Sequence, residues 1–243
     1  MQDPNSLPIP RKVAAGRGWR WFVEAFQIVR LQPLTWVLLT LVYILIQIGL
    51  SIIPLLGDLA SALIGPVFAA SFVLAAAKSE RGEELELADL FAAFRQMPGP
   101  LLLLGAMLIG LMLAIIVAGV ALGASGGLMT ALLGKGSISD TGIGAGAVAL
   151  LVIVAGVGGA LLGMAYWFAP ALVALSRLNP WPALRTGLKA GLRNWLPLLV
   201  VSLVLMVSCV LALLPLGLGL LLWIPVASVT AYTGWRDVFG PQQ

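Results

Sequence analysis

Six stretches of this chain are apolar over the length of a membrane-spanning helix, and none of them contains Asp, Glu, Lys or Arg. They are residues 34–53, 59–77, 100–122, 147–175, 196–214 and 216–232. A helix needs about 20 apolar residues to cross the hydrocarbon core of a bilayer. Only 10% of all residues are charged, whereas a typical soluble domain has about 25%. The sequence therefore predicts an all-α, polytopic membrane protein with six transmembrane helices arranged as three hairpins.

The Lys and Arg residues gather on one side of this six-span arrangement. Of the 14 in the chain, only Lys135 lies on the opposite side. The others lie in residues 1–33, 78–99 and 176–195 and after the last span. Cytoplasmic loops of membrane proteins carry an excess of Lys and Arg. We therefore expect both termini to be cytoplasmic.

Each hairpin is preceded by a cytoplasmic segment whose apolar residues recur at helical spacing. In the first segment they are Trp19, Phe22, Val23, Phe26 and Val29, and in the second they are Leu87, Leu90, Phe91 and Phe94. In the third they are Trp181, Leu184, Leu188, Leu192 and Trp195. Charged residues occupy the opposite face of each segment. Amphipathic helices of this kind lie in the headgroup region of a bilayer, so we expect three interfacial helices.

The alternation of interfacial segment and hairpin indicates an internal repeat. We interpret residues 19–239 as a single transmembrane domain that follows a disordered tail over residues 1–18. The repeated units would be residues 19–80, 81–178 and 179–239. The alternative is that basic linkers and scattered prolines occur in any polytopic protein with short cytoplasmic loops.

Prolines recur at matching places in the three units. The second span of each unit carries one before its cytoplasmic exit, at Pro66, Pro170 and Pro225. Proline inside a helix removes a hydrogen bond, so we expect a kink at each position. The outer turns of units one and three also match, at residues 53–57 and 214–219. Unit two differs, because we expect a Gly-rich loop over residues 123–145.

Small residues recur every four positions in the two spans of the middle hairpin. Helices in lipid associate by close approach of their backbones, which small residues permit. We therefore expect this hairpin to pack along a seam formed by Ala106, Gly110, Ala114, Gly159 and Gly163. A seam between two copies of the chain, or with another membrane protein, is the alternative.

The basic residues of the third cytoplasmic segment are expected to contact phospholipid headgroups. They are Arg177, Arg185, Lys189 and Arg193. Each such charge near an anionic leaflet contributes about 1 kcal/mol. Specific recognition of a headgroup or of a phosphate-bearing ligand is the sharper alternative. The acidic residues between positions 80 and 89 fit the first turn of the second amphipathic helix, where acids favour the helix dipole. The alternative is a site for a divalent cation or a basic partner.

The sequence lacks the residues that most catalytic and metal sites require. It contains no histidine, and its one cysteine, Cys209, lies in an apolar run. No acid lies within a span, so no base or nucleophile has a partner there. We expect no catalytic residues, no metal and no cofactor, and nucleic acid is not an expected partner because no basic tract is present. Gln47 is the most polar residue near a span centre, and it suits an interhelical hydrogen bond or a ligand contact.

The chain resembles a group of uncharacterised six-span bacterial proteins. The resemblance rests on the aromatic and basic residues of the three amphipathic segments and on Pro66, Pro170 and Pro225. This group includes the YciC-like proteins and the membrane domain attached to some glycerophosphodiester phosphodiesterases. The resemblance implies an all-helical protein of the bacterial inner (plasma) membrane. It implies no catalytic residues. We hypothesise a non-catalytic membrane protein that acts through lipid or protein contacts. A passive permease or exporter for a small apolar or amphiphilic solute is the alternative.

Overall fold

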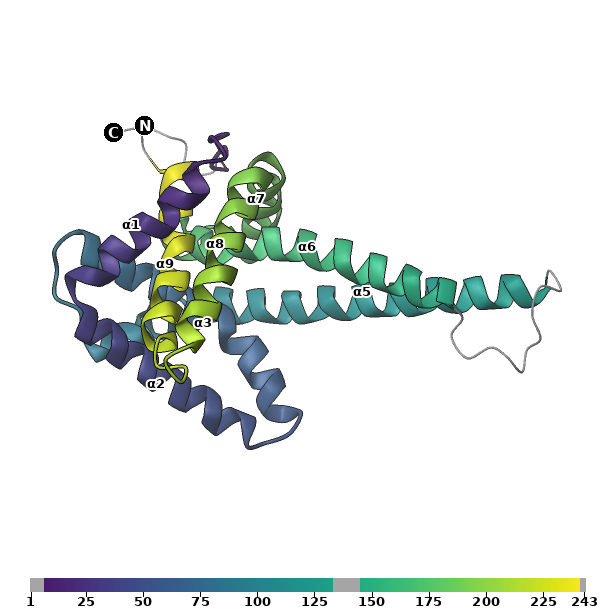
Figure 1. Cartoon of the computed structure of the whole chain (residues 1–243), viewed down its shortest axis with the longest axis horizontal. Helices are drawn as coiled ribbons and strands as arrows, with labels where there is room; N and C mark the ends of the chain where they lie inside the picture. Colours follow the sequence, from purple (N-terminus) through teal and green to yellow (C-terminus); the bar gives the residue numbers. More distant parts are fainter. Residues whose placement is uncertain (1–6, 133–144, 241–243) are drawn as a thin grey trace. The chain divides into compact units, whose positions relative to one another are not determined.

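The computed structural model describes residues 7–132 and 145–240, with side chains for residues 7–122 and 149–240, and the elements in this part of the chain are helices (Figure 1). In chain order they are α1 (Arg17–Leu31), α2 (Pro33–Ser51), α3 (Leu56–Glu80), the 3₁₀-helix η1 (Leu87–Phe91), α4 (Ala92–Gln96), α5 (Pro98–Leu132), α6 (Ala145–Ser176), α7 (Pro180–Arg193), α8 (Trp195–Leu213) and α9 (Leu220–Phe239). The predicted all-α class is confirmed.

Five helices are long and apolar enough to cross a membrane. They comprise Pro33–Ser51, Leu56–Glu80, Pro98–Leu122, Ala149–Ser176 and Trp195–Leu213. The sixth predicted span folds as α9, which begins at Leu220 and is not among the five. Threonines and then Arg236 and Asp237 fill its last turns and lower its hydropathy. The six-span arrangement therefore stays a prediction.

The helix α5 is longer than the sequence predicted. It continues to Leu132, so residues 123–132 are helical and not part of a loop. Glycine is a poor helix former in water. In lipid, however, every backbone N–H and C=O must find an internal partner, which favours the helix despite its glycines. The rest of the predicted loop, with Lys135 and Asp140, lies outside the described residues.

The chain divides into two compact units, residues 1–105 with 164–243, and residues 106–163. In the first of these compact units, α9 packs against α1, α2, α3 and α8. Its core contains large, fully buried side chains from several helices, among them Trp21, Trp36 and Phe168. The three prolines predicted to kink the second spans, Pro66, Pro170 and Pro225, lie inside α3, α6 and α9 respectively, and all are buried.

The second compact unit contains most of α5 and the first part of α6, and the contact between these helices differs from the predicted seam. A Cβ atom built on Gly119 would lie 2.6 Å from Leu151 Cδ1, and one on Gly158 would lie 2.9 Å from Ile115 Cγ2. At Gly110, Gly159 and Gly163 a Cβ atom would meet open space. Ala106 and Ala114 are exposed.

The predicted stripe is displaced by one residue from the observed contact. Residue 115 replaces residue 114, and residue 158 replaces residue 159. One residue corresponds to about 100° of rotation around a helix, which is enough to turn a stripe out of a contact. The predicted small-residue packing within the hairpin is therefore not the arrangement found.

Candidate functional site

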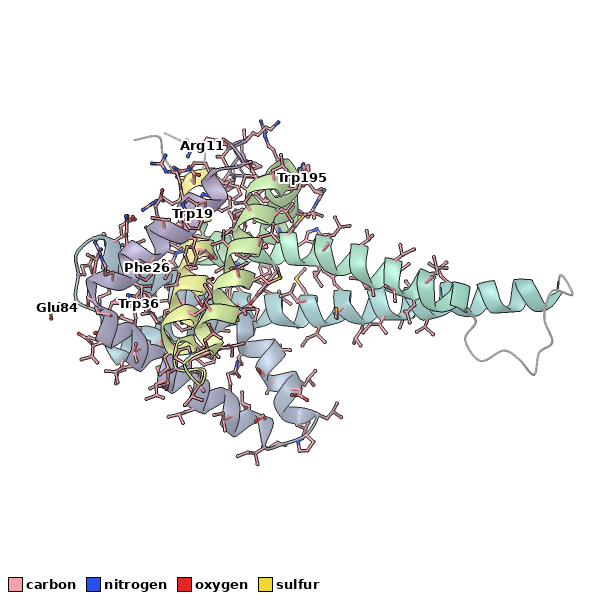
Figure 2. All side chains as sticks on the ribbon, in the orientation of Figure 1. Arg11, Trp19, Phe26, Trp36, Glu84 and Trp195 are labelled. Carbon is pink, nitrogen blue, oxygen red and sulfur yellow. The ribbon has the colours of Figure 1, made fainter. Side chains whose placement is uncertain are left out.

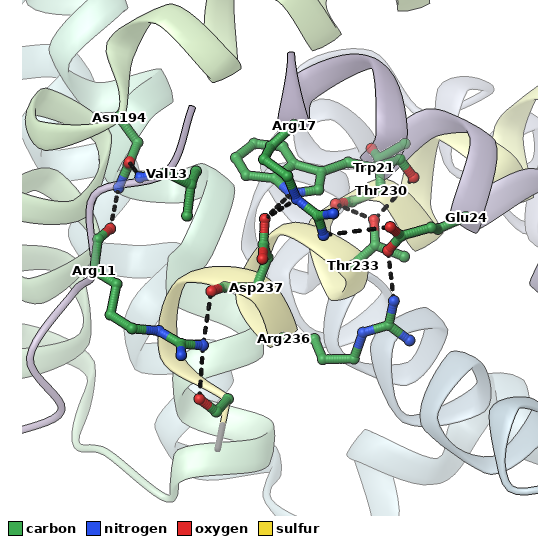
Figure 3. Close-up of polar contacts among 11 residues, drawn as sticks. Arg11, Val13, Arg17, Trp21, Glu24, Asn194, Thr230, Thr233, Arg236 and Asp237 are labelled. Carbon is green, nitrogen blue, oxygen red and sulfur yellow. Dashed lines mark hydrogen bonds and ion pairs between the residues drawn. The ribbon is translucent and has the colours of Figure 1, made fainter. Parts of the chain in front are cut away.

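The structure brings together a cluster of charged and aromatic side chains where α1, α3 and α9 meet. Figure 3 shows the part of the cluster between α1 and α9. We call Arg17, Trp21, Glu24, Glu80, Tyr232, Arg236 and Asp237 the polar cluster. On α1, Arg17, Trp21 and Glu24 are spaced four and three residues apart, so they share one face of the helix. That face packs against α9, which carries Arg236 and Asp237 in its last turns.

Asp237 accepts hydrogen bonds from two side chains of α1. Arg17 Nε lies 2.6 Å from Asp237 Oδ2, and Trp21 Nε1 lies 2.8 Å from the same oxygen. The Trp21 side chain is fully buried, so its indole N–H needs such a partner. Arg17 also lies 3.3 Å from Glu24 Oε1. The single carboxylate of Asp237 therefore fixes both the position and the rotation of α1 against α9.

Arg236 joins two acids from different helices. Its guanidinium donates to Glu24 Oε2 on α1 at 2.5 Å and forms an ion pair with Glu80 at the end of α3. The hydroxyl group of Tyr232 donates to the other oxygen of Glu80, also at 2.5 Å. Arg236 thus links α1, α3 and α9, which lie far apart in the sequence.

The acids of the polar cluster are committed to structural contacts. Desolvation opposes the charge on Arg17, but its contacts with Asp237 and Glu24 outweigh this effect and raise its pKa above the ordinary value. Arg17 therefore stays charged at any physiological pH. Glu24, Glu80 and Asp237 each form an ion pair with an arginine. The arrangement holds helices together.

Sequence reasoning missed the polar cluster. It placed Glu24 on the face opposite the apolar residues of the first amphipathic segment, and it counted Arg236 only among the cytoplasmic charges. A signal was present in the adjacent Arg236 and Asp237, a charged pair that ends an otherwise apolar helix. Such a pair needs partners of both signs, and Arg17 with Glu24 offers them one helix away.

The segment before α1 is also anchored, although residues 1–18 were expected to be disordered. Val13 N donates to Asn194 Oδ1 at 2.8 Å, and Asn194 Nδ2 donates to the carbonyl oxygen of Arg11 at 2.8 Å. The Arg11 guanidinium donates to the carbonyl oxygens of Asp237 and Gly240 (Figure 3). Residues 11–13 therefore join the end of α9 to the corner between α7 and α8. Residues 1–6 lie outside the described part of the chain.

The predicted lipid-contact residues are all exposed. Arg177 follows the end of α6 with a φ of 54°, and Arg185, Lys189 and Arg193 lie on α7. Their spacing of four places the latter three in one row along the helix. None of the four forms an ion pair with a residue that the structure describes. We call Arg185, Lys189 and Arg193 the basic row.

The helix α7 presents three different sides. Ala183, Gly187 and Ala190 face the protein, and a methyl group on Gly187 would overlap the carbonyl oxygen of Ala165 in α6. Trp181 and Leu192 are about half exposed beside the basic row, as is Trp195 at the start of α8 (Figure 2). An exposed apolar side next to a row of cations is typical of a helix in the membrane interface.

The helix α1 also has one side against the protein and one exposed apolar side. Its protein-facing side contains Trp21, Ala25 and Ile28, whereas Trp19 and Phe26 are exposed (Figure 2). Trp19 and Phe26 were assigned to a single apolar face together with Val29, which is buried. The predicted face is therefore two faces, one against the protein and one exposed.

The second predicted amphipathic helix folds as two short pieces, η1 and α4. Glu86 and Asp89 form a reciprocal capping box at the start of η1, which accounts for two of the acids. Asp89 also accepts from Lys78 at 2.9 Å, and Glu83 pairs with Arg81. Among the described residues, no group of acids is arranged to hold a metal ion.

The polar residues inside the spans bond within the protein. Gln47 Nε2 donates to the hydroxyl group of Tyr43 at 2.8 Å, and Gln47 Oε1 accepts from Ser61 of α3 at 2.8 Å. The structure thus places Gln47 in the interhelical hydrogen bond that was one of its two predicted roles. Ser71 Oγ accepts from the backbone N–H of Ala93 at 3.1 Å.

Comparison with known proteins agrees with a membrane protein. The chain is 28% identical to a "probable inner membrane protein" of Burkholderia thailandensis over 256 residues, which cover 96% of this chain and 94% of that protein. No protein-family model matches the chain. No solved structure matches it either. The chain is thus similar over nearly its whole length to a protein described by its location.

Proposed function

We propose that this protein is a non-catalytic, integral protein of the bacterial inner membrane that acts by holding interfacial helices against anionic phospholipid. The observation that carries the proposal is the basic row on α7, which is exposed and flanked by half-exposed Trp181 and Leu192. The Burkholderia relative, which matches over 94% of its length and is described as a probable inner membrane protein, supports the location. Both termini would be cytoplasmic, as the distribution of Lys and Arg predicts.

The pairing of charges in the structure supports an anionic partner. The acids Glu24, Glu80 and Asp237 are neutralised by arginines within the protein. The exposed cations of α7 have no such acid on their own helix. A leaflet that contains anionic lipid supplies the missing negative charge, and each cation near it gains about 1 kcal/mol.

The structure gives less support to the alternative of a passive permease. A solute path would need polar groups free to contact water or solute. Gln47, the strongest candidate for such a contact, bonds to Tyr43 and Ser61. Ser208 in α8 donates to its own helix and accepts from Trp223 Nε1 at 3.0 Å. These groups are used for packing between neighbouring helices.

The lipid proposal predicts that neutralising the basic row lowers the preference for anionic headgroups. We expect the triple variant Arg185→Gln, Lys189→Gln, Arg193→Gln to lose at least about tenfold of that preference, since each charge contributes about 1 kcal/mol. The measurement reconstitutes the full chain in nanodiscs of phosphatidylcholine with a minor fraction of spin-labelled phosphatidylglycerol. The fraction of immobilised label then reports the preference.

A charge-preserving variant provides the matched control. Arg185→Lys, Lys189→Arg, Arg193→Lys keeps the cations in the same row and should retain the preference. Equal immobilisation of phosphatidylglycerol by the native chain and by the neutral variant would contradict the proposal. If the charge-preserving variant also lost the preference, specific geometry and not charge would be responsible.

The proposed topology predicts that cysteines in the α3–η1 loop and in the α8–α9 turn react with thiol reagent from opposite sides of the membrane. In a Cys209→Ala background, Glu84→Cys should react with membrane-impermeant thiol reagent only from the cytoplasm. Leu216→Cys, whose native side chain is 96% exposed in the turn between α8 and α9, should react only from the other side. The assay compares intact cells with inverted vesicles. Labelling of both cysteines from one side would exclude this topology, including a membrane crossing by α9.

A further inference from the structure

Three corners of the chain have the same backbone shape. A single residue separates α1 from α2, α4 from α5, and α7 from α8. These residues are Gln32 with φ −140° and ψ 60°, Met97 with φ −153° and ψ 53°, and Asn194 with φ −120° and ψ 36°. At each corner a short amphipathic helix ends and a long apolar helix begins. The similar dihedral angles indicate equivalent positions in the three repeated units predicted from the sequence, residues 19–80, 81–178 and 179–239. In this subsection, unit one, unit two and unit three mean these repeated units.

Two of the corner side chains make the same pair of hydrogen bonds. Gln32 Oε1 accepts from Leu85 N at 2.8 Å, and Gln32 Nε2 donates to the carbonyl oxygen of Glu83 at 2.8 Å. Asn194 makes the corresponding two bonds to Val13 N and the Arg11 carbonyl oxygen, also at 2.8 Å. Each amide thus binds the C=O of one residue and the N–H of the second residue after it.

The segments bound by these amides occupy equivalent places in the chain. Residues 83–85 lead into η1, the first helix of unit two. Residues 11–13 lead toward α1, the first helix of unit one. The corner of unit one therefore holds the lead-in of unit two, and the corner of unit three holds the lead-in of unit one. This order closes on itself.

Helix packing follows the same cyclic order. η1 and α4 pack on α3, and α7 approaches α6 so closely that a methyl group on Gly187 would overlap Ala165. In both cases the amphipathic helix of one unit lies on the last helix of the preceding unit. α1 packs on α9, so the last unit stands before the first.

The outer turns of units one and three add a further correspondence. Leu55 and Leu216 each follow a proline and have positive φ, 64° and 53°. Gly57 and Gly219 each sit against the carbonyl group of the residue seven positions earlier, where a side chain would overlap it. The glycine follows Leu55 by two residues and Leu216 by three, so the second turn is one residue longer. A leucine with positive φ directly after a proline is rare, and its presence in both turns indicates a related turn.

We propose that the chain is a closed ring of three related helical units, and that residues 11–13 are the clasp that closes it. The clasp, which leads into unit one, binds unit three at two places, the corner between α7 and α8 and the end of α9. Its backbone pairs with Asn194, and Arg11 N donates to the carbonyl oxygen of Val238 at 3.0 Å. The Arg11 side chain donates to the carbonyl oxygens of Asp237 in α9 and of Gly240, which directly follows the helix.

The third junction of the ring, between units two and three, lacks the hydrogen bonds of a corner side-chain amide. Its corner residue, Met97, has no side-chain amide, and its side chain is buried. The segment before α7 instead completes the end of α6, with Arg177 at positive φ and Leu178 N donating to the Leu172 carbonyl oxygen at 3.3 Å. Units two and three are therefore joined by helix packing and not by a corner amide.

Hydrogen exchange of single amides tests the two corner contacts. In Asn194→Leu we expect the Val13 amide to exchange about fivefold faster or more, because it loses its acceptor, while Leu85 is unchanged. In Gln32→Leu we expect the opposite result: the backbone amide of Leu85 should exchange faster, while that of Val13 is unchanged. Asn194→Asp keeps the acceptor and should keep Val13 protected, which serves as the control if the leucine variant fails to fold. Unchanged Val13 protection in a folded Asn194→Leu protein would overturn the clasp.

A circular permutant tests the ring itself. Gly240 is joined through residues 241–243 and a short Gly-Ser linker to Leu7, and the new ends are placed between Arg81 and Gly82. A ring predicts that this permutant elutes as the native chain does and retains protection at both Val13 and Leu85. A second permutant cut inside α9, between Thr230 and Ala231, should fail. Loss of Val13 protection in the first permutant, or equal behaviour of both permutants, would overturn the ring.

Discussion

Arg236→Met is expected to lower the free energy of unfolding by about 2 kcal/mol. Removing one partner of a buried ion pair costs about 3–5 kcal/mol, and partial exposure of these side chains reduces the effect. The variant leaves Glu24 and Glu80 without their shared cation, at side-chain exposures of 22% and 33%. The measurement is reversible unfolding in SDS, followed by tryptophan fluorescence. Arg20→Met, at an exposed position of α1, is the matched control and should change stability little.

Neutralising Glu80 should recover part of this lost stability. We expect the double variant Glu80→Gln, Arg236→Met to be more stable than Arg236→Met alone, because Glu80 is the carboxylate that loses its cation, whereas Glu24 keeps Arg17 at 3.3 Å. A protein in which Arg236→Met unfolds like Arg20→Met would contradict the assignment of Arg236 as the link between α1, α3 and α9.

Gly18→Ala is expected to destabilise the protein by about 1–3 kcal/mol, the usual cost of overpacking a close contact. A methyl group on Gly18 of α1 would overlap the carbonyl oxygen of Pro197 in α8. That oxygen belongs to the backbone, so relief requires the two helices to move apart. The same SDS unfolding assay measures the effect.

Gly110→Ala provides the opposite case. A Cβ atom at Gly110 would meet open space, and alanine in a helix is favoured over glycine by about 0.5–1 kcal/mol. The variant should therefore be neutral or slightly stabilising. A destabilising Gly110→Ala would instead restore the predicted small-residue seam as a real contact, within the hairpin or between copies. A neutral Gly18→Ala would contradict the close approach of α1 to α8.

The apolar helices were predictable because lipid constrains them more than any other solvent. The predicted spans 34–53 and 196–214 differ by one or two residues from α2 and α8. Arg30 and Gln32 precede α2, and Arg193 and Asn194 precede α8, and such charged and strongly polar side chains are costly in hydrocarbon. The end of α5 was not predictable in this way, because its last ten residues contain no charge.

Partner choice within the protein was not predictable. An apolar face read from sequence does not distinguish lipid from another helix, since both are equally apolar solvents for a side chain. The face assigned to α1 therefore combined buried Val29 with exposed Trp19 and Phe26. The polar cluster was missed for a related reason, because its residues in α9 lie more than 150 positions from their partners in α1 and α3.

The length of α5 has a consequence for the bilayer around it. The helix has 35 residues, so at about 1.5 Å per residue it extends about 52 Å. The hydrocarbon core of a typical bilayer is about 30 Å thick. α6, with 32 residues, shows a similar excess. A hydrophobic helix of this length must tilt, or thicken the lipid around it, or extend into the headgroups, and each ångström of mismatch has a free-energy cost. The hairpin of α5 and α6 is thus matched to membrane thickness differently from α2 and α8, which have 19 residues each. A single protein that combines both lengths must therefore tilt its longer helices, extend them into the headgroups, or make the thickness of the lipid around it uneven.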